Sequence, residues 1–226
     1  MPLMNVDAPR PFLNRRHAGR VLAARLRAYA GRSDVIVLAL PRGGVPVGFE
    51  IASELRAPLD VFVVRKLGVP GHEELAMGAI ASGGVRVLND DVVRALNVPG
   101  RTVDRVTEVE DRERLRREQL YRGDRRFPEL RHQVVILVDD GLATGSSMRA
   151  AAYALRPHRP GRVVVAVPTA AAETRDRLAL EVDELICAIT PEPFYAVGRW
   201  YEEFAQTTDQ EVRDLLARSL PGVGEP

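Results

Sequence analysis

Residues 134–147 have the sequence Val-Val-Ile-Leu-Val-Asp-Asp-Gly-Leu-Ala-Thr-Gly-Ser-Ser. The first five residues form a continuous apolar run, which is typical of a β-strand buried on both faces of a parallel sheet. Two acids and a turn of small residues follow, and the next residues up to Leu155 favour a helix. The segment therefore predicts a strand, a tight turn and a helix, which is the repeating unit of an α/β fold.

The turn after this strand has the chemistry of a phosphate site. A helix N-terminus presents unpaired N–H groups and the positive end of its dipole, so an anion binds there readily. Thr144, Ser146 and Ser147 add hydroxyl donors, and Gly145 lets the backbone approach a ligand closely. The spacing after Gly141 and the absence of a lysine after Gly145 exclude a Walker loop.

Asp139 and Asp140 lie between the strand and that turn. Their carboxylates can accept hydrogen bonds from the two hydroxyls of a vicinal diol. A diol-binding pair beside a phosphate-binding turn predicts a ribose 5-phosphate ligand. The alternative interpretation is a plain Asp-Asp-Gly turn before a capped helix, in which the rest of the pattern would be accidental.

The same alternation of apolar runs and helical segments extends in both directions. We expect a central, mostly parallel β-sheet flanked by helices, with right-handed crossovers and a small hood or lid region. One domain is expected over residues 1–226, with residues 65–125 and 190–206 contributing the flexible loop and the hood. The expected strands are 35–40, 59–64, 85–88, 133–138, 162–168 and 184–189, and the expected helices are 14–29, 45–55, 91–96, 103–121, 173–180 and a last one, capped by Thr208 or Asp209, that ends at Ser219.

Composition restricts the classes of partner. With 32 basic and 31 acidic residues the formal net charge is +1, which argues against extensive binding to nucleic acid or anionic membrane. No apolar run approaches the ~20 residues of a spanning helix, and the N-terminus lacks a signal-peptide core. Cys187, the only cysteine, fits a reducing compartment. We expect a cytoplasmic protein with small-molecule ligands, and its sequence is compatible with a homodimer.

The segment Leu40-Pro-Arg-Gly-Gly offers a second anion site. It follows the apolar run 35–40 and precedes a helical segment, so it should lie at the same carboxyl edge of the sheet as Asp139. The N–H groups of Gly43 and Gly44 and the guanidinium of Arg42 would face a ligand there. The alternative is an ordinary strand-to-helix turn that uses glycine for its geometry.

Residues 64–74 are rich in turn formers and could close over a ligand. They contain Arg65 and Lys66, the single lysine of the chain. A ligand role for Lys66 competes with its being an ordinary surface lysine. His72 is as well explained by loop exposure as by function.

The run 134–147 resembles the signature of the type I phosphoribosyltransferases. That resemblance implies that Asp139 and Asp140 bind the 2- and 3-hydroxyls of 5-phosphoribosyl-1-pyrophosphate. It further implies that the turn binds the 5-phosphate, which gives a substrate-binding set of Gly141, Leu142, Ala143, Thr144, Gly145, Ser146 and Ser147. In this family a turn like Arg42-Gly43-Gly44 binds pyrophosphate and often carries a non-proline cis peptide, and a mobile loop with an Arg-Lys pair like Arg65-Lys66 meets the pyrophosphate.

The expected acceptor side is residues 193–204, after the last apolar run. Purine enzymes of the resembled family hold the base there, and Trp200 or Tyr201 could stack on a ring; the alternative is that these aromatics belong to the core. In 6-oxopurine enzymes an aspartate usually stands where this chain has Ala143, so the adenine and orotate enzymes are nearer models. The chain also resembles bacterial phosphoribosyltransferases of unassigned acceptor in which an opening like 12–19, Phe-Leu-Asn-Arg-Arg-His-Ala-Gly, precedes Pro-Arg-Gly-Gly.

The resemblance implies transfer of a 5-phosphoribosyl group to a nitrogen acceptor, with a nucleobase as one candidate. Mg²⁺ would be bound mainly by ligand oxygens and water, with Asp139 and Asp140 as indirect ligands, while Arg42, Arg65 and Lys66 stabilise the leaving pyrophosphate. The main rival is a non-catalytic sensor of the sugar pyrophosphate that regulates a partner. A hydrolase of phosphoribosyl compounds ranks lower, because no residue set for activating water is evident.

Overall fold

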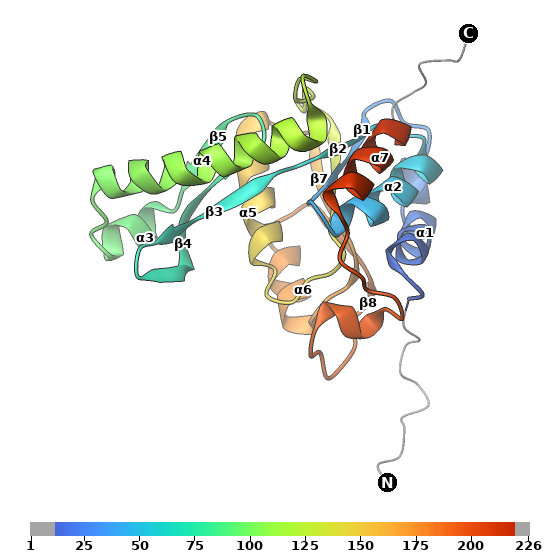
Figure 1. Cartoon of the computed structure of the whole chain (residues 1–226). Coiled ribbons are helices and arrows are strands. Elements are labelled where there is room, and N and C mark those ends of the chain that lie inside the picture. The colour runs from blue at the N-terminus through green and yellow to red at the C-terminus, as the bar shows by residue number, and fades with distance from the viewer. Residues whose placement is uncertain (1–11, 220–226) are drawn as a thin grey trace.

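The computed structural model describes residues 12–219, and its centre is a parallel sheet of five strands in the order β2-β1-β6-β7-β8 (Figure 1). Continuous apolar runs build β1 and β6, all of whose residues are buried. The expected parallel sheet and its flanking helices are confirmed. The five strands are β1 (Val35–Ala39), β2 (Leu59–Val61), β6 (Val134–Val138), β7 (Arg162–Thr169) and β8 (Glu184–Ile189).

Helices cover both faces of this sheet because successive strand residues point to opposite sides. Val37 and Ile136 face the layer of α1 (Arg15–Arg25), α2 (Gly44–Leu55) and α7 (Asp209–Ser219). Leu38 and Leu137 face the layer of α5 (Ser146–Leu155) and α6 (Ala172–Ala179). Figure 1 shows α1, α2 and α7 together on one side of the sheet and α5 and α6 on the other. Short 3₁₀ turns lie at Arg27–Tyr29, Arg156–His158 and Val197–Trp200 (η1, η2 and η3). Thr208 caps α7 by accepting from the Glu211 N–H at 3.1 Å.

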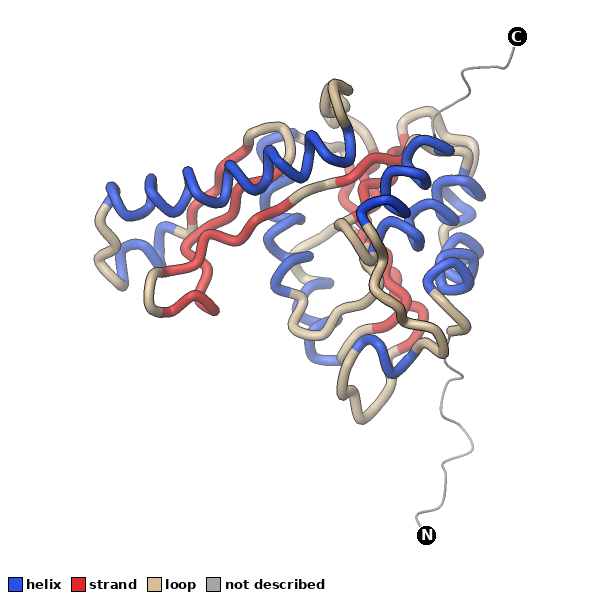
Figure 2. The backbone as a smooth tube through the Cα atoms, in the orientation of Figure 1, coloured by secondary structure: helices blue, strands red, loops and turns tan. Residues whose placement is uncertain are grey.

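A second, antiparallel sheet projects from the core as a hood, as Figure 2 shows. It consists of β3 (Val64–Val69), β4 (His72–Ala81) and β5 (Val85–Leu88), accompanied by α3 (Asp90–Ala95) and α4 (Gly100–Arg122). Its own small core contains Leu67, Met77, Ile80 and Val103. Within residues 12–219, no helix combines the length and the apolar character that crossing a bilayer requires.

The prediction of a loop over residues 64–74 is wrong, because these residues form a β-hairpin. Val69 pairs with His72 across a two-residue turn, and Gly71, with φ +81°, occupies the position of a Pro-Gly turn that requires positive φ. Gly78 lies inside β4, where a Cβ would come within 2.4 Å of the Val87 carbonyl oxygen. Glycine there permits close strand approach and does not end the strand.

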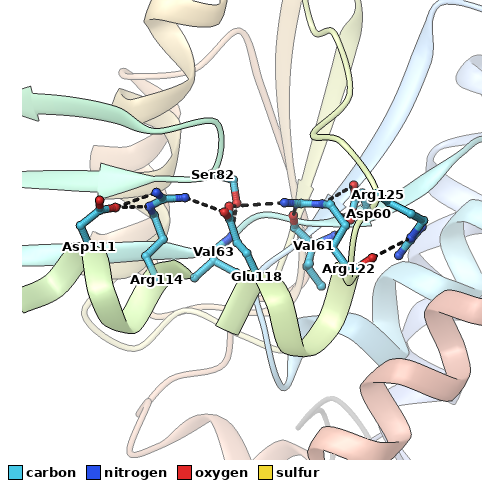
Figure 3. Close-up of polar contacts among 9 residues, drawn as sticks. All are labelled: Asp60, Val61, Val63, Ser82, Asp111, Arg114, Glu118, Arg122 and Arg125. Carbon is cyan, nitrogen blue, oxygen red and sulfur yellow. Dashed lines mark hydrogen bonds and ion pairs between the residues drawn. The ribbon is translucent and has the colours of Figure 1, made fainter. Parts of the chain in front are cut away.

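A buried ionic network fixes α4 to the edge of the central sheet (Figure 3). Arg122 Nε lies 3.0 Å from Asp60 Oδ2 on β2, and Arg122 Nη2 donates to the Val61 carbonyl at 2.8 Å. One turn earlier in the helix, Glu118 lies 3.4 Å from Arg122 Nη1 and 2.5 Å from Arg114 Nη1. Arg114 and Arg122 of the Arg-rich helix α4 are buried, and the acids beside them neutralise their charge.

Candidate functional site

The two predicted anion loops lie side by side because β1 and β6 pair in register. Ala39 is opposite Val138, so the chain segments that leave these two strands are neighbours. A Cβ on Gly44 would lie 2.6 Å from the Val138 carbonyl oxygen, and a Cβ on Gly43 would lie 2.0 Å from Oδ2 of Asp140. The glycines of the first loop thus allow it to contact the acids of the second.

A Gly44→Ala substitution tests this close approach. The new methyl group would overlap backbone atoms of Val138 and Asp139, which cannot rotate away. We expect a loss of stability of about 1–3 kcal/mol, measured by urea unfolding. Gly100→Ala is the matched control: its Cβ would meet nothing within 4 Å, so it should be neutral or slightly stabilising. Equal stability of the two variants would contradict the packing of the two loops.

The first loop also has the backbone feature that the family resemblance implies. The peptide bond between Pro41 and Arg42 is cis. The Arg42 side chain is about one-third exposed, and its Nη1 lies 3.8 Å from Oδ1 of Asp209 on α7. The Tyr121 hydroxyl of α4 donates to the same Asp209 oxygen at 2.6 Å. Arg42 is therefore at the carboxyl edge of the sheet, with a countercharge supplied by α7.

The second loop is hydrogen-bonded to β7 and α6, the strand and helix that follow α5 in the chain. The Leu142 N–H donates to the Thr169 carbonyl at 2.8 Å, and the Thr174 hydroxyl donates to the Ala143 carbonyl at 2.7 Å. Gly145 has φ +69° and immediately precedes α5, so the turn requires glycine at this position. The side chain of Leu142 is in the core, which leaves only its main chain to face a ligand. Thr144, Ser146 and Ser147 are arranged around the start of α5, where Thr144 Oγ1 and Ser146 Oγ lie 3.2 Å apart.

The two acids are in an environment that disfavours their charge. Burial, and after it the charge of Asp140, raises the pKa of Asp139 well above its ordinary value. Burial also raises the pKa of Asp140, while Arg15 opposes that shift. The Asp140 N–H donates to Oδ1 of Asp139 at 2.8 Å. A ligand that brings hydroxyl donors or a cation would therefore relieve an unfavourable state of these carboxylates.

Arg15 is a site residue that sequence reasoning missed. Its Nε donates to Oδ2 of Asp140 at 2.8 Å. The two residues are separated by 125 positions, and no local pattern in the sequence links them. The only available signal was that Arg15 belongs to the opening segment that the resembled bacterial proteins share.

A model of the phosphoribosyl transferase domain family matches residues 13–195, which include both loops. The chain belongs to this family. Two Mycobacterium tuberculosis proteins, from strains H37Rv and CDC 1551, are 48% identical to it over 208 residues; the first is named "Putative phosphoribosyl transferase Rv0571c". The match covers 92% of this chain and 47% of each relative, so the chain spans about half the length of these curated relatives.

Two solved structures share the fold of this chain. The TT1426 protein from Thermus thermophilus is 39% identical, with a TM-score of 0.85 over 92% of this chain and 98% of that chain. The AQ2163 protein from Aquifex aeolicus, at 14% identity and a TM-score of 0.50, covers 81% of this chain and 78% of its own, and shares the fold alone.

In this phosphoribosyl transferase domain the predicted Arg-Lys pair is divided between two faces of a strand. Arg65 and Lys66 are consecutive residues of β3, so their side chains point to opposite sides. Arg65 points to α4, where its Nε and Nη2 each lie 2.7 Å from Oε2 of Glu110. Lys66 lines a hollow of about 730 Å³ with Ser146 and Arg149 of α5. The structure thus brings Lys66, and not Arg65, to the side of the turn that precedes α5.

Trp200 and Tyr201, the two aromatic residues predicted to contact the acceptor, differ in their surroundings. Tyr201 is buried, its ring stacks on Phe204 at 4.9 Å between centroids, and its hydroxyl donates to the Asp140 carbonyl at 2.6 Å. Core packing covers the Tyr201 ring, as the alternative of a core aromatic expects, and stacking of Tyr201 on a substrate ring stays a prediction. Trp200 is partly exposed, and within residues 12–219 its buried Nε1 has no hydrogen-bond partner. Trp200 is the better candidate for contact with an acceptor.

Proposed function

We propose that this domain transfers the 5-phosphoribosyl group of 5-phosphoribosyl-1-pyrophosphate to a nitrogen acceptor and releases pyrophosphate. The observation that carries the proposal is the juxtaposition of Asp139 and Asp140 with two backbone anion loops at one edge of the sheet. The acids suit the ribose hydroxyls, the turn at residues 143–147 suits the 5-phosphate, and Arg42-Gly43-Gly44 suits the pyrophosphate. Family membership supports the same ligand class.

The proposed reaction exchanges one bond at C1 of the ribose for another. The bond from C1 to the pyrophosphate oxygen breaks and its electron pair leaves with pyrophosphate. The acceptor nitrogen forms the new bond on the opposite face and gives up a proton. The ribose carbon develops positive charge as the leaving group departs, as in glycoside chemistry. The role of the protein is then to position the sugar and to stabilise negative charge on the leaving group with Arg42 and Lys66.

The residues of the site fit a magnesium ion that arrives with the ligand. Among the side chains that the structure describes, no group of three or more His, Cys, Asp or Glu residues could hold a metal ion by itself. Mg²⁺ commonly takes one or two carboxylate contacts and completes its shell with phosphate oxygens and water. Asp139 and Asp140 are the carboxylates that would make such contacts, directly or through water. When bound, the ion would neutralise charge on the departing pyrophosphate.

The direct test is pyrophosphate release from 5-phosphoribosyl-1-pyrophosphate and Mg²⁺ in the presence of a panel of nucleobases and other nitrogen acceptors. We expect release that depends on one acceptor, with the phosphoribosylated acceptor as the second product. Binding of the sugar pyrophosphate without release for any acceptor would favour a sensor. Release without any acceptor would indicate a hydrolase, and failure to bind the sugar pyrophosphate would refute the proposal.

Lys66→Ala should lower turnover in that assay by about 10²–10³-fold, because one electrostatic contact to the leaving group is lost. Arg65→Ala is the matched comparison, since Arg65 points to Glu110 on the opposite face of β3. We expect its turnover to stay within about tenfold of that of the unaltered protein. Unchanged turnover for Lys66→Ala would remove this lysine from the proposed mechanism.

A further inference from the structure

Arg15 is fixed by three partners at the edge of the proposed site. Besides its bond to Asp140, its Nη1 donates to the Ala205 carbonyl oxygen at 2.7 Å, and its guanidinium lies 3.9 Å from the ring centroid of Phe204. The Arg15 side chain is 12% exposed. Its neighbours on α1, Arg16 and Arg20, are 40% and 60% exposed and reach Glu50 at 3.8 and 3.5 Å. Arg15 thus differs from these two arginines of its helix in burial and in the closeness of its contacts.

The same stretch of chain reaches Asp140 by a second route. Tyr201 donates to the main-chain oxygen of Asp140 at 2.6 Å, and its ring packs on Phe204. Residues 201–205, called the acceptor-side segment below, therefore bind Asp140 at its backbone directly and at its carboxylate through Arg15. If the segment moved relative to Asp140, both the Tyr201 hydrogen bond and the contacts through Arg15 would have to break or Asp140 would have to move with it.

Hydrogen bonds of the first described residues place Arg15 between Asp140 and the acceptor-side segment. The Phe12 N–H donates to the Trp200 carbonyl at 2.6 Å, and the Glu202 N–H donates to the Phe12 carbonyl at 2.8 Å. Asn14 then caps α1 by accepting from the His17 N–H at 3.0 Å. The helix consequently begins at Arg15, next to the acceptor-side segment. Phe12, Asn14 and Arg15 of the shared opening each have a specific structural task in this arrangement.

We propose that Arg15 is a positioning residue for sugar binding, an inference that rests on the proposed function. It holds Oδ2 of Asp140 with a single donor, which leaves Oδ1 and the remaining lone pair of Oδ2 to accept from a ribose hydroxyl. Through Ala205 and Phe204 it also couples the orientation of that carboxylate to the acceptor-side segment. Sugar binding at Asp140 is therefore transmitted to Trp200, which adjoins the segment where the acceptor is expected.

The only tryptophan of the chain, Trp200, provides the readout. The 226-residue chain would be titrated with 5-phosphoribosyl-1-pyrophosphate and Mg²⁺ while Trp200 fluorescence and binding heat are recorded. Arg15→Gln should bind the sugar pyrophosphate about 10–100-fold more weakly, because a charged hydrogen-bond partner of Asp140 is lost. It should also show a smaller fluorescence change at saturation. Arg15→Lys keeps the charge and should recover part of the affinity, and Arg20→Gln, an exposed arginine of the same helix, should behave as the unaltered protein does.

The possible results separate this inference from the proposed function. If the unaltered protein binds the sugar pyrophosphate and Arg15→Gln binds it equally well, the positioning role is overturned and the proposed function stands. If affinity falls but the fluorescence change at saturation is unaltered, the coupling to the acceptor-side segment is overturned. If the unaltered protein does not bind, the proposed function fails and this inference fails with it. Thermal unfolding of each variant identifies loss of fold. If Arg15→Gln does not fold, the affinity and the fluorescence change of Arg15→Lys are compared with those of the unaltered protein instead.

Discussion

Replacing Asp139 and Asp140 together by asparagine should weaken binding of 5-phosphoribosyl-1-pyrophosphate by about 10²–10⁴-fold. Each carboxylate is proposed to accept a hydrogen bond from one ribose hydroxyl, and a hydrogen bond to a charged group contributes about 1.5–3 kcal/mol. Asparagine keeps the shape but presents one neutral oxygen in place of two charged ones. Calorimetry with Mg²⁺ present measures the change. Asp214→Asn, an exposed acid on α7, is the control, and retained affinity in the double variant would refute the assignment of the diol site.

Asp139→Asn alone should leave the ligand-free protein at least as stable as the unaltered protein near neutral pH. Burial raises the pKa of Asp139 above its ordinary value of 3.8, so its contribution to stability is present below that pH and is lost as pH rises through the folded-state pKa. Asparagine carries no such titration. Thermal unfolding over a pH series should therefore show the advantage of the variant growing from acid to neutral pH. A variant that is less stable throughout would contradict the cost assigned to this partly buried charge.

Such a pattern, weaker binding with retained stability, is expected of residues kept for a ligand. Asp139 has no cationic partner within hydrogen-bonding distance among the interactions of the described chain, and its Oδ1 accepts from the Asp140 N–H. Asp140 is balanced by Arg15. The acid pair is thus compensated on one side and open on the other, which is the arrangement that a polyol ligand could complete.

The central sheet and the positions of the two loops at its edge could be predicted because their signals are local. A fully apolar run such as Val134–Val138 identifies a strand buried on both faces, and the Gly-rich turn after it identifies the start of a helix. Since parallel strands end at one edge, the proximity of Arg42-Gly43-Gly44 to Asp139 followed from topology alone. Local chemistry and a simple fold rule were sufficient there.

The hood was harder to predict because its glycines occupy two different kinds of position, in a turn and inside a strand. Gly71 is a turn residue, whereas Gly78 lies within β4 at a close contact with β5. Composition does not distinguish these cases, so a hairpin was interpreted as a loop. Strand alternation then separated Arg65 from Lys66, which a loop would have left free to act together.

Long-range charge pairs were beyond sequence reasoning for a different reason. Arg15 meets Asp140, and Arg122 meets Asp60, only after the layers have packed. With arginine so abundant in the chain, no single arginine was distinguished by its residue type. Burial distinguishes Arg114 and Arg122 from the exposed arginines of α4, and burial is a property of the tertiary structure.

Removing the guanidinium of Arg122 should have the largest effect on stability. Its side chain is 4% exposed and bonds Asp60, Glu118 and the Val61 carbonyl. Arg122→Met keeps much of the volume but leaves Asp60 and Glu118 without this cation. Breaking a buried pair from one side costs about 3–5 kcal/mol, which urea unfolding would measure. Arg116→Met, on the same helix but 61% exposed, should change stability by no more than about 1 kcal/mol.

The effect of Arg122→Met on stability should also depend on the charge of its partner Asp60. If the loss arises from the uncompensated Asp60 charge, the double variant Asp60→Asn, Arg122→Met should recover part of the stability, because the acid is neutralised while its bond from the Val61 N–H at 2.7 Å can be kept. If the double variant is as unstable as the sum of the two single variants, Arg122 acts through packing on Phe127, whose ring centroid lies 5.1 Å from its guanidinium. The first result would identify the ionic network of Figure 3 as the element that holds the hood helix to the sheet that carries the proposed site.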